Sequence, residues 1–169
     1  MNINQVKVIA FDVFGTVVDF SSAESWQVRN YIEAIQLPTW RPLMLPCSWE
    51  RLPAHPDSRE GIKRLRSKFM VVTCSNGPLG MLARLSKNAG IEWDAIIPLE
   101  LNRVYKPRPD AYRTVCEVLG VTPDEVLMVT ANKTFGDLEA SREIGMQAQL
   151  IRGDDGPKTI IELAELLGC

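Results

Sequence analysis

The sequence contains a single histidine, His55, among 169 residues. A Ser-His-Asp or Cys-His catalytic apparatus would have to use this residue, and a histidine-rich metal site is excluded. The neighbours of His55, "LPA" and "PDS", are typical of a turn, so we expect it in a surface loop. Any chemistry is therefore expected to depend on carboxylates, lysine and hydroxyl groups.

Cysteine is also scarce, and no two cysteines have the CxxC spacing of a zinc or redox site. The four are Cys47, Cys74, Cys116 and Cys169. Neither a disulfide framework nor a zinc site is indicated, which makes a reduced cytoplasmic protein the expectation. The N-terminus lacks the pattern of a signal peptide, and no stretch is long and apolar enough to span a bilayer.

The net charge is small, at -2, and no run of basic residues stands out. We therefore expect neither a nucleic-acid groove nor a polybasic membrane-binding surface. The chain is 46% hydrophobic, which suffices for the core of one ordinary domain.

Short apolar, β-branched runs alternate with helical patterns, as in a doubly wound α/β sheet. The expected strands are 6–13, 69–75, 94–99, 125–131 and 147–152. The expected helices are about 57–68, 78–90, 108–120, 136–145 and 158–168. Glycines that suit a left-handed C-terminal cap follow four of the helices, namely Gly90, Gly120, Gly145 and Gly168.

Residues 18–55 interrupt this alternation. One amphipathic helix, "SAESWQVRNYIEAIQ", precedes the Pro- and Trp-rich segment "LPTWRPLMLPCSWERLPAHP", where five prolines between positions 38 and 56 prevent a long helix. We interpret residues 18–55 as a small cap over the mouth of the sheet, and residues 1–17 and 56–169 as the core. A long crossover connection without a lid role is the alternative.

The carboxyl ends of parallel strands meet at one edge of a sheet, and ligands bind there. The first strand ends at Asp12, and a buried carboxylate is usually held by a partner or used in chemistry. Other polar residues at this edge are Thr16, Ser75, Asn76, Lys106, Tyr112, Thr130, Asn132 and Asp137. Their expected convergence makes Asp12 a candidate nucleophile.

A carboxylate can attack carbon or phosphorus and form an ester that water later hydrolyses. Lys106 would keep Asp12 ionised by lowering its pKa, and Asp137 would position the water. Hydroxyl and amide donors would orient the anionic end of a small substrate. Each residue also has an ordinary interpretation: Ser75-Asn76-Gly77 is a common helix-capping turn, and an aspartate such as Asp137 often begins a helix.

Four segments in this order resemble the motifs of the haloacid dehalogenase superfamily: "FDVFGT", "CSNG", "YKPRPDAY" and "ANKTFGDLEASREIGM". The resemblance covers nearly the whole chain apart from the insertion. It implies a Rossmann-like core with strand order 3-2-1-4-5 and a cap inserted after the first strand.

At two positions the sequence differs from the phosphatases of this superfamily, and both differences favour its dehalogenase branch. The acid/base aspartate expected two residues after the nucleophile is replaced by Phe14, and a halide leaving group needs no proton. The earlier acidic magnesium ligand of the fourth motif falls near Asn132 or Lys133, where a lysine would oppose a cation. The sequence looks like the (S)-2-haloacid dehalogenases, which implies no metal or other cofactor.

In that branch Asp12 would displace halide from C2 with inversion, and water oriented by Asp137 would hydrolyse the ester. Thr16 and Lys106 would hold Asp12. The residues expected to bind substrate or support the pocket are Phe14, Ser75 (substrate carboxylate), Asn76 (halide), Tyr112 and Asn132. Dehalogenases of this type often form homodimers, which leaves a homodimer open here.

In such dehalogenases the cap supplies an arginine for the halide and aromatic walls for the pocket. The insertion in this sequence is only about half as long as that cap. Arg29 and Arg41 are the candidates for the halide-binding arginine. The fourth motif, "ANKTFGD", also has two more residues before Asp137 than the family motif. Two other functions stay open. One is a Mg²⁺-dependent phosphatase of a small phosphate ester, with Asp12 and Asp137 as metal ligands; the other is a catalytically weak binding protein that uses the Trp/Pro segment as an interface.

Overall fold

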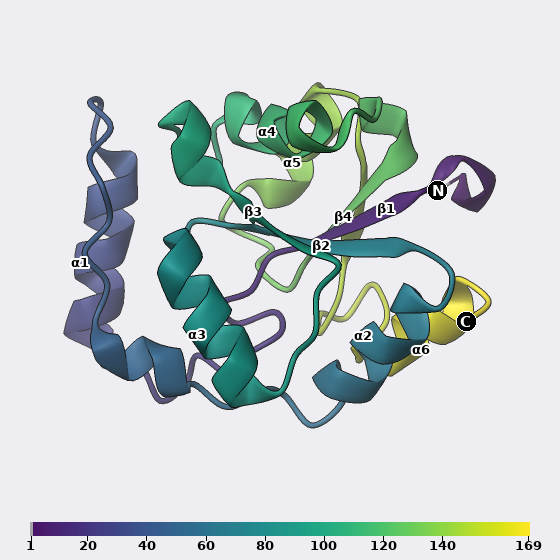
Figure 1. Cartoon of the computed structure of the whole chain (residues 1–169), viewed down its shortest axis with the longest axis horizontal. Coiled ribbons are helices and arrows are strands. Elements are labelled where there is room, and N and C mark those ends of the chain that lie inside the picture. The colour runs from purple at the N-terminus through teal and green to yellow at the C-terminus, as the bar shows by residue number, and fades with distance from the viewer. Residues whose placement is uncertain (1) are drawn as a thin grey trace.

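A computed structural model describes residues 2–169, and its centre is one five-stranded parallel sheet with the order β3-β2-β1-β4-β5 (Figure 1). The strands are β1 (Val8–Phe11), β2 (Met70–Ser75), β3 (Ala95–Pro98), β4 (Val126–Thr130) and β5 (Gln147–Leu150). The predicted Rossmann-like α/β class and strand order 3-2-1-4-5 are confirmed. Each strand lies within its predicted range and is shorter by up to four residues.

Helices cover both faces of the sheet, with α4 and α5 on one face and α2, α3 and α6 on the other (Figure 1). The helices are α1 (Ser25–Gln36), α2 (Ser58–Arg66), α3 (Leu79–Ala89), α4 (Pro109–Leu119), α5 (Asp137–Glu143) and α6 (Ile160–Leu166). Alternate residues of β1 enter the two cores, Ile9 on the α2/α6 side and Ala10 on the α4 side. The four predicted capping glycines all have positive φ.

The segment between β1 and β2 contains α1, an extended stretch, the short 3₁₀ helix η2 (Cys47–Arg51) and α2. In Figure 1, α1 and the extended stretch lie side by side at one edge of the molecule. An isolated antiparallel bridge joins Val18 to Ala54, so the chain leaves and re-enters the core at one point. Because this bridge joins the two ends of the segment, we propose that residues 18–55 form the cap.

Two expectations about this region need correction. His55 lies in a loop but is half-buried, because its Nε2 contacts the Gly15 carbonyl at 3.3 Å. The Trp/Pro segment is only partly exposed: Met44 is 93% exposed, whereas Trp49 is 1% exposed because η2 folds back onto the core. None of the helices within residues 2–169 is long and apolar enough to cross a membrane.

Candidate active site

Asp12 follows β1 directly and lies at the carboxyl edge of the sheet. Its backbone N–H donates to the Val129 carbonyl at 2.9 Å, which continues the pairing of β1 with β4. Its carboxylate is largely buried: Oδ1 accepts from Lys106 Nζ at 2.8 Å, and Oδ2 accepts from Thr16 Oγ1 at 2.8 Å. Both oxygens therefore have a fixed partner, as a buried carboxylate requires.

A tight loop returns Thr16 to Asp12. Gly15 takes a φ of 81°, a left-handed conformation that favours glycine, and its N–H donates to the Val18 carbonyl at 2.9 Å. The Thr16 hydroxyl accepts from the Ala131 N–H at 2.8 Å while it donates to Asp12. Its proton therefore points at the carboxylate.

Lys106 connects two carboxylates. Its fully buried Nζ lies 2.8 Å from Asp12 Oδ1 and 3.0 Å from Asp137 Oδ2. The other oxygen of Asp137 accepts from the Tyr112 hydroxyl at 2.6 Å. Asn76 fixes the Lys106 backbone by accepting from its N–H at 2.7 Å and donating to its carbonyl at 3.0 Å. The four predicted catalytic residues thus lie in one hydrogen-bonded cluster.

Burial raises the pKa of Asp12, and the charge of Asp137 raises it further, while Lys106 and Thr16 offset only part of the effect. Lys106 lowers the pKa of Asp12, as expected, but the net pKa of Asp12 is still raised because desolvation outweighs the ion pair. For Lys106, burial opposes the charge, but the two carboxylates raise its pKa well above its usual value. Lys106 stays cationic.

An apolar cavity of about 130 Å³ opens beside Asp12. Besides Asp12 and Asp137, its lining comprises Phe14, Phe20, Val28, Tyr31, Ile32, Asn132 and Phe135. The ring of Phe14 packs against those of Phe20 and Trp49, with centroids 5.5 and 5.3 Å apart. Two carboxylates at one end of an apolar cavity suit covalent hydrolysis of a small, partly apolar substrate.

A family model described as haloacid dehalogenase-like hydrolase matches residues 41–132, just over half of the chain. The (S)-2-haloacid dehalogenase of Xanthobacter autotrophicus is 30% identical, and the match covers 93% of this chain and 84% of that protein. The chain belongs to the haloacid dehalogenase-like hydrolases.

Other members of this family agree with the assignment. The (S)-2-haloacid dehalogenase 4A of Burkholderia cepacia is 25% identical, over 92% of this chain and 87% of that protein. A solved defluorinating L-2-haloacid dehalogenase superposes with a TM-score of 0.78 at 26% identity, over 97% and 96% of the two chains. The Xanthobacter alignment extends over 215 residues although this hydrolase has 169, so that relative contains segments that this chain lacks.

Two further predicted residues of the hydrolase lie at the same edge of the sheet, and of these Asn132 lines the cavity whereas Ser75 does not. The Ser75 hydroxyl is fully buried and has no hydrogen-bond partner within residues 2–169. Such a group is costly unless a partner satisfies it, which makes Ser75 a candidate contact for a ligand. Asn132 lines the cavity, but its Oδ1 accepts from the Thr134 and Phe135 N–H groups, both at 3.1 Å, which leaves its amide nitrogen for a ligand.

Sequence reasoning missed the cap residues of the cavity. Tyr31 and Ile32 of α1 and Phe20 before it line the cavity with Phe14. Burial raises the pKa of the Tyr31 phenol, Lys106 opposes this effect, and Asp12 adds to it. The Tyr31 side chain therefore lies close to the Asp12–Lys106 ion pair. The helical spacing of Val28, Tyr31 and Ile32 was the available signal, since these positions share one face of α1.

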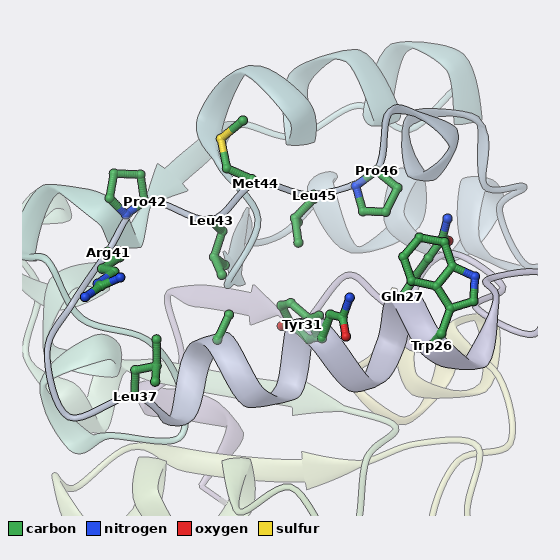
Figure 2. A pocket seen from close by; sticks show the side chains of 12 residues that line it. Trp26, Gln27, Tyr31, Leu37, Arg41, Pro42, Leu43, Met44, Leu45 and Pro46 are labelled. Atoms are coloured by element: carbon green, nitrogen blue, oxygen red, sulfur yellow. The ribbon is translucent and has the colours of Figure 1, made fainter.

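Neither arginine suggested as a halide ligand lines the cavity. Arg29 is exposed on α1. Arg41 is exposed and borders a separate groove of about 280 Å³ between α1 and residues 41–46. Figure 2 shows Arg41 and Leu37 at one end of that groove and Trp26 at the other. Lys133, expected to oppose a cation in the site, instead extends to the surface, where it pairs with Asp155 at 3.4 Å.

The substitution Arg41→Ala is therefore expected to leave halide release from a 2-haloacid unchanged. The guanidinium borders the outer groove and not the cavity beside Asp12, so its removal changes no group that faces the substrate. Steady-state kinetics of the purified variant check this. A large fall in kcat would instead show that Arg41 reaches the substrate.

Proposed function

We propose that this hydrolase dehalogenates small 2-haloalkanoic acids through an ester on Asp12, without a metal ion. The observation that carries the proposal is the pairing of Asp12 with Lys106 and Thr16 beside a cavity in which Phe14 stands at the position of the phosphatase acid/base. A phosphate ester needs a proton on its leaving alkoxide, whereas a halide leaves as an anion without one.

In the first step a carboxylate oxygen of Asp12 attacks C2 of the substrate. The new C–O bond forms as the carbon–halogen bond breaks, the electron pair leaves with the halide, and C2 inverts. Lys106 and Thr16 orient the nucleophile through their hydrogen bonds to Oδ1 and Oδ2. The aromatic and aliphatic side chains of the cavity lower the local polarity, which strengthens these interactions.

In the second step water attacks the carboxyl carbon of the Asp12 ester. Asp137 accepts the proton, the Asp12 carboxylate is restored, and the 2-hydroxy acid and a proton are released. Lys106 and Tyr112 hold one oxygen of Asp137 each, and each oxygen has a second lone pair for the water. Asp137 begins α5, so its carboxylate is positioned by a helix rather than by a mobile loop.

The free donors suit a substrate with a carboxylate. The buried hydroxyl of Ser75 would gain a partner from the substrate carboxylate. Asn76 donates one N–H to the Lys106 carbonyl, and a halide would share its second N–H with the Tyr31 phenol. A cavity of about 130 Å³ fits an acid of few carbons, and the partner of this site is then a small anionic molecule.

A paired assay tests the proposal. Halide release is measured from each enantiomer of 2-chloropropionate, and phosphate release from a generic aryl phosphate, each with Mg²⁺ and with a chelator. We expect halide from the S enantiomer, indifferent to the chelator. Phosphate release that requires Mg²⁺ would replace the proposal with a phosphatase in which Asp12 and Asp137 hold the ion.

The substitution Asp137→Asn is expected to trap the ester on Asp12. An amide cannot accept the proton from water, and loss of a general base typically slows its step by about 10²- to 10⁴-fold. Intact-protein mass spectrometry should show the ester adduct, in which the substrate is joined to Asp12 through C2, after one halide per protein is released. The double variant Asp12→Asn/Asp137→Asn is the control and should gain no mass. Steady turnover by Asp137→Asn without an adduct would contradict the role of Asp137.

A further inference from the structure

Arg152 lies behind the nucleophile loop, which we define as residues 12–18, and joins it to the start of α2. Its Nη1 and Nη2 donate to Oδ1 and Oδ2 of Asp57, both at 3.0 Å. Its Nε donates to the Thr16 carbonyl at 2.9 Å. Both side chains of the ion pair are largely buried, so this fork-to-fork contact is shielded from solvent and geometrically rigid.

The nucleophile loop is held at a second carbonyl as well. The Ser58 hydroxyl donates to the Val17 carbonyl at 2.7 Å, and the Ile160 N–H donates to Asp57 Oδ2 at 2.6 Å. Two consecutive carbonyls of the loop are therefore fixed from outside it. The anchors are Arg152, which follows β5, and Ser58 at the start of α2, and they are distant in sequence.

The backbone of Arg152 has a φ of 61°, uncommon for a residue with a side chain. Its N–H donates to the Pro157 carbonyl at 2.9 Å, which holds this turn. A glycine would adopt the conformation more easily, and Gly153 follows immediately. Such conformations persist where the surrounding structure imposes them, often at functional sites. The contacts of the Arg152 side chain hold this residue in a conformation that a glycine would adopt more easily.

We propose that Arg152 and Asp57 are positioning residues that fix the nucleophile loop so that the Thr16 hydroxyl stays on Asp12. The Thr16 carbonyl and hydroxyl belong to one residue: Arg152 holds the first, and the second donates to Asp12 Oδ2 at 2.8 Å. Neither Arg152 nor Asp57 lines the cavity. The inference rests on the proposed role of Asp12 as the nucleophile.

We call the contacts of Arg152 with Asp57 and the Thr16 carbonyl the clamp. Loss of the clamp is expected to change the pKa of Asp12, whereas loss of a purely structural ion pair would not. The Thr16 hydrogen bond is one of the interactions that lower the pKa of Asp12 against burial and Asp137, while Lys106 provides the larger one. If Thr16 moves away, the pKa of Asp12 rises further. The nucleophile is then protonated at a higher pH, so the acid limb of the pH profile of kcat/KM moves to higher pH.

The substitution Arg152→Lys separates positioning from stability. A lysine keeps a positive charge beside Asp57 but cannot donate to Asp57 and the Thr16 carbonyl at once in the geometry of a guanidinium. We expect kcat to fall at least about tenfold with KM nearly unchanged, because small misplacements of reacting groups cost up to about 10²-fold. Asp57→Asn should act in the same direction. The titration of Asp12, followed by NMR of ¹³C-labelled aspartate without substrate, should shift upward in both variants.

Two comparisons decide the proposal. Arg66→Lys alters a partly buried ion pair of α2 with Asp94, at 3.0 Å, that does not touch the nucleophile loop, so its pH profile should stay unchanged. In a Thr16→Val background, Arg152→Lys should cause no further shift of the Asp12 titration. Equal losses of Tm in Arg152→Lys and Arg66→Lys with unchanged Asp12 titrations would overturn the proposal, as would a full shift in the Thr16→Val background. Absence of halide release from the unmodified protein would instead overturn the proposed function, while the substrate-free titration would still test the clamp.

Discussion

The substitution Asp12→Asn is expected to abolish halide release and to leave the fold intact. An amide cannot form the ester, and removal of a covalent nucleophile costs on the order of 10⁴- to 10⁶-fold in kcat. Burial raises the pKa of Asp12 and so disfavours its charged form, which offsets part of the cost of turning an amide N–H toward one of the two donors that now face the carboxylate. Lys106 keeps Asp137 as its partner. Tm should therefore fall only slightly, which calorimetry checks beside the halide assay.

The matched control is Asp19→Asn. Asp19 lies just beyond the nucleophile loop, and its Oδ1 accepts from the Ser21 N–H at 2.8 Å without contact to Asp12. This variant should retain turnover. If Asp12→Asn also kept the full rate, the nucleophile would have to be sought elsewhere, and the proposed function would fall with it.

The arrangement of the sheet could be predicted because it depends on local patterns. Apolar β-branched runs define the strands, and a parallel sheet brings their carboxyl ends to one edge. The register pairs Phe11 with Thr73 on β2 and with Val129 on β4, so residues just after these positions are neighbours. This alignment explains why Asp12, Ser75 and Asn76 lie near one another although more than sixty residues separate them.

The cap side of the site could not be predicted in the same way. The contact of Tyr31 with Trp49, at a centroid distance of 5.6 Å, depends on how a Pro-rich segment folds back, and no periodicity encodes that path. The ion pair of Arg152 with Asp57 joins residues 95 positions apart without a motif. The net pKa shift of Asp12 was also beyond sequence reasoning, because the cost of desolvation depends on how completely the folded chain buries it.

The substitution Lys106→Met is expected to have the largest effect on stability. Methionine fills a similar volume but leaves Asp12 and Asp137 buried without their cation. Breaking a buried ion pair by removing one partner typically costs about 3–5 kcal/mol in the free energy of unfolding. Turnover should fall by at least about 10²-fold, since loss of one group that stabilises the reacting charge has this effect. Urea denaturation at neutral pH and the halide assay measure the two losses.

The pH dependence of that loss identifies its electrostatic origin. Lys106 is the main interaction that lowers the pKa of Asp12, so its removal raises that pKa further above the unfolded value. A carboxyl group whose folded pKa is raised destabilises the folded state at high pH, and the penalty disappears as the pH falls through the folded pKa. Lys106→Met should therefore regain stability relative to the unmodified protein in mildly acidic buffer. Lys133→Met, which removes an exposed lysine, should show no such recovery. A stability deficit of Lys106→Met that is independent of pH would mean that lost packing, and not unpaired charge, is the cause.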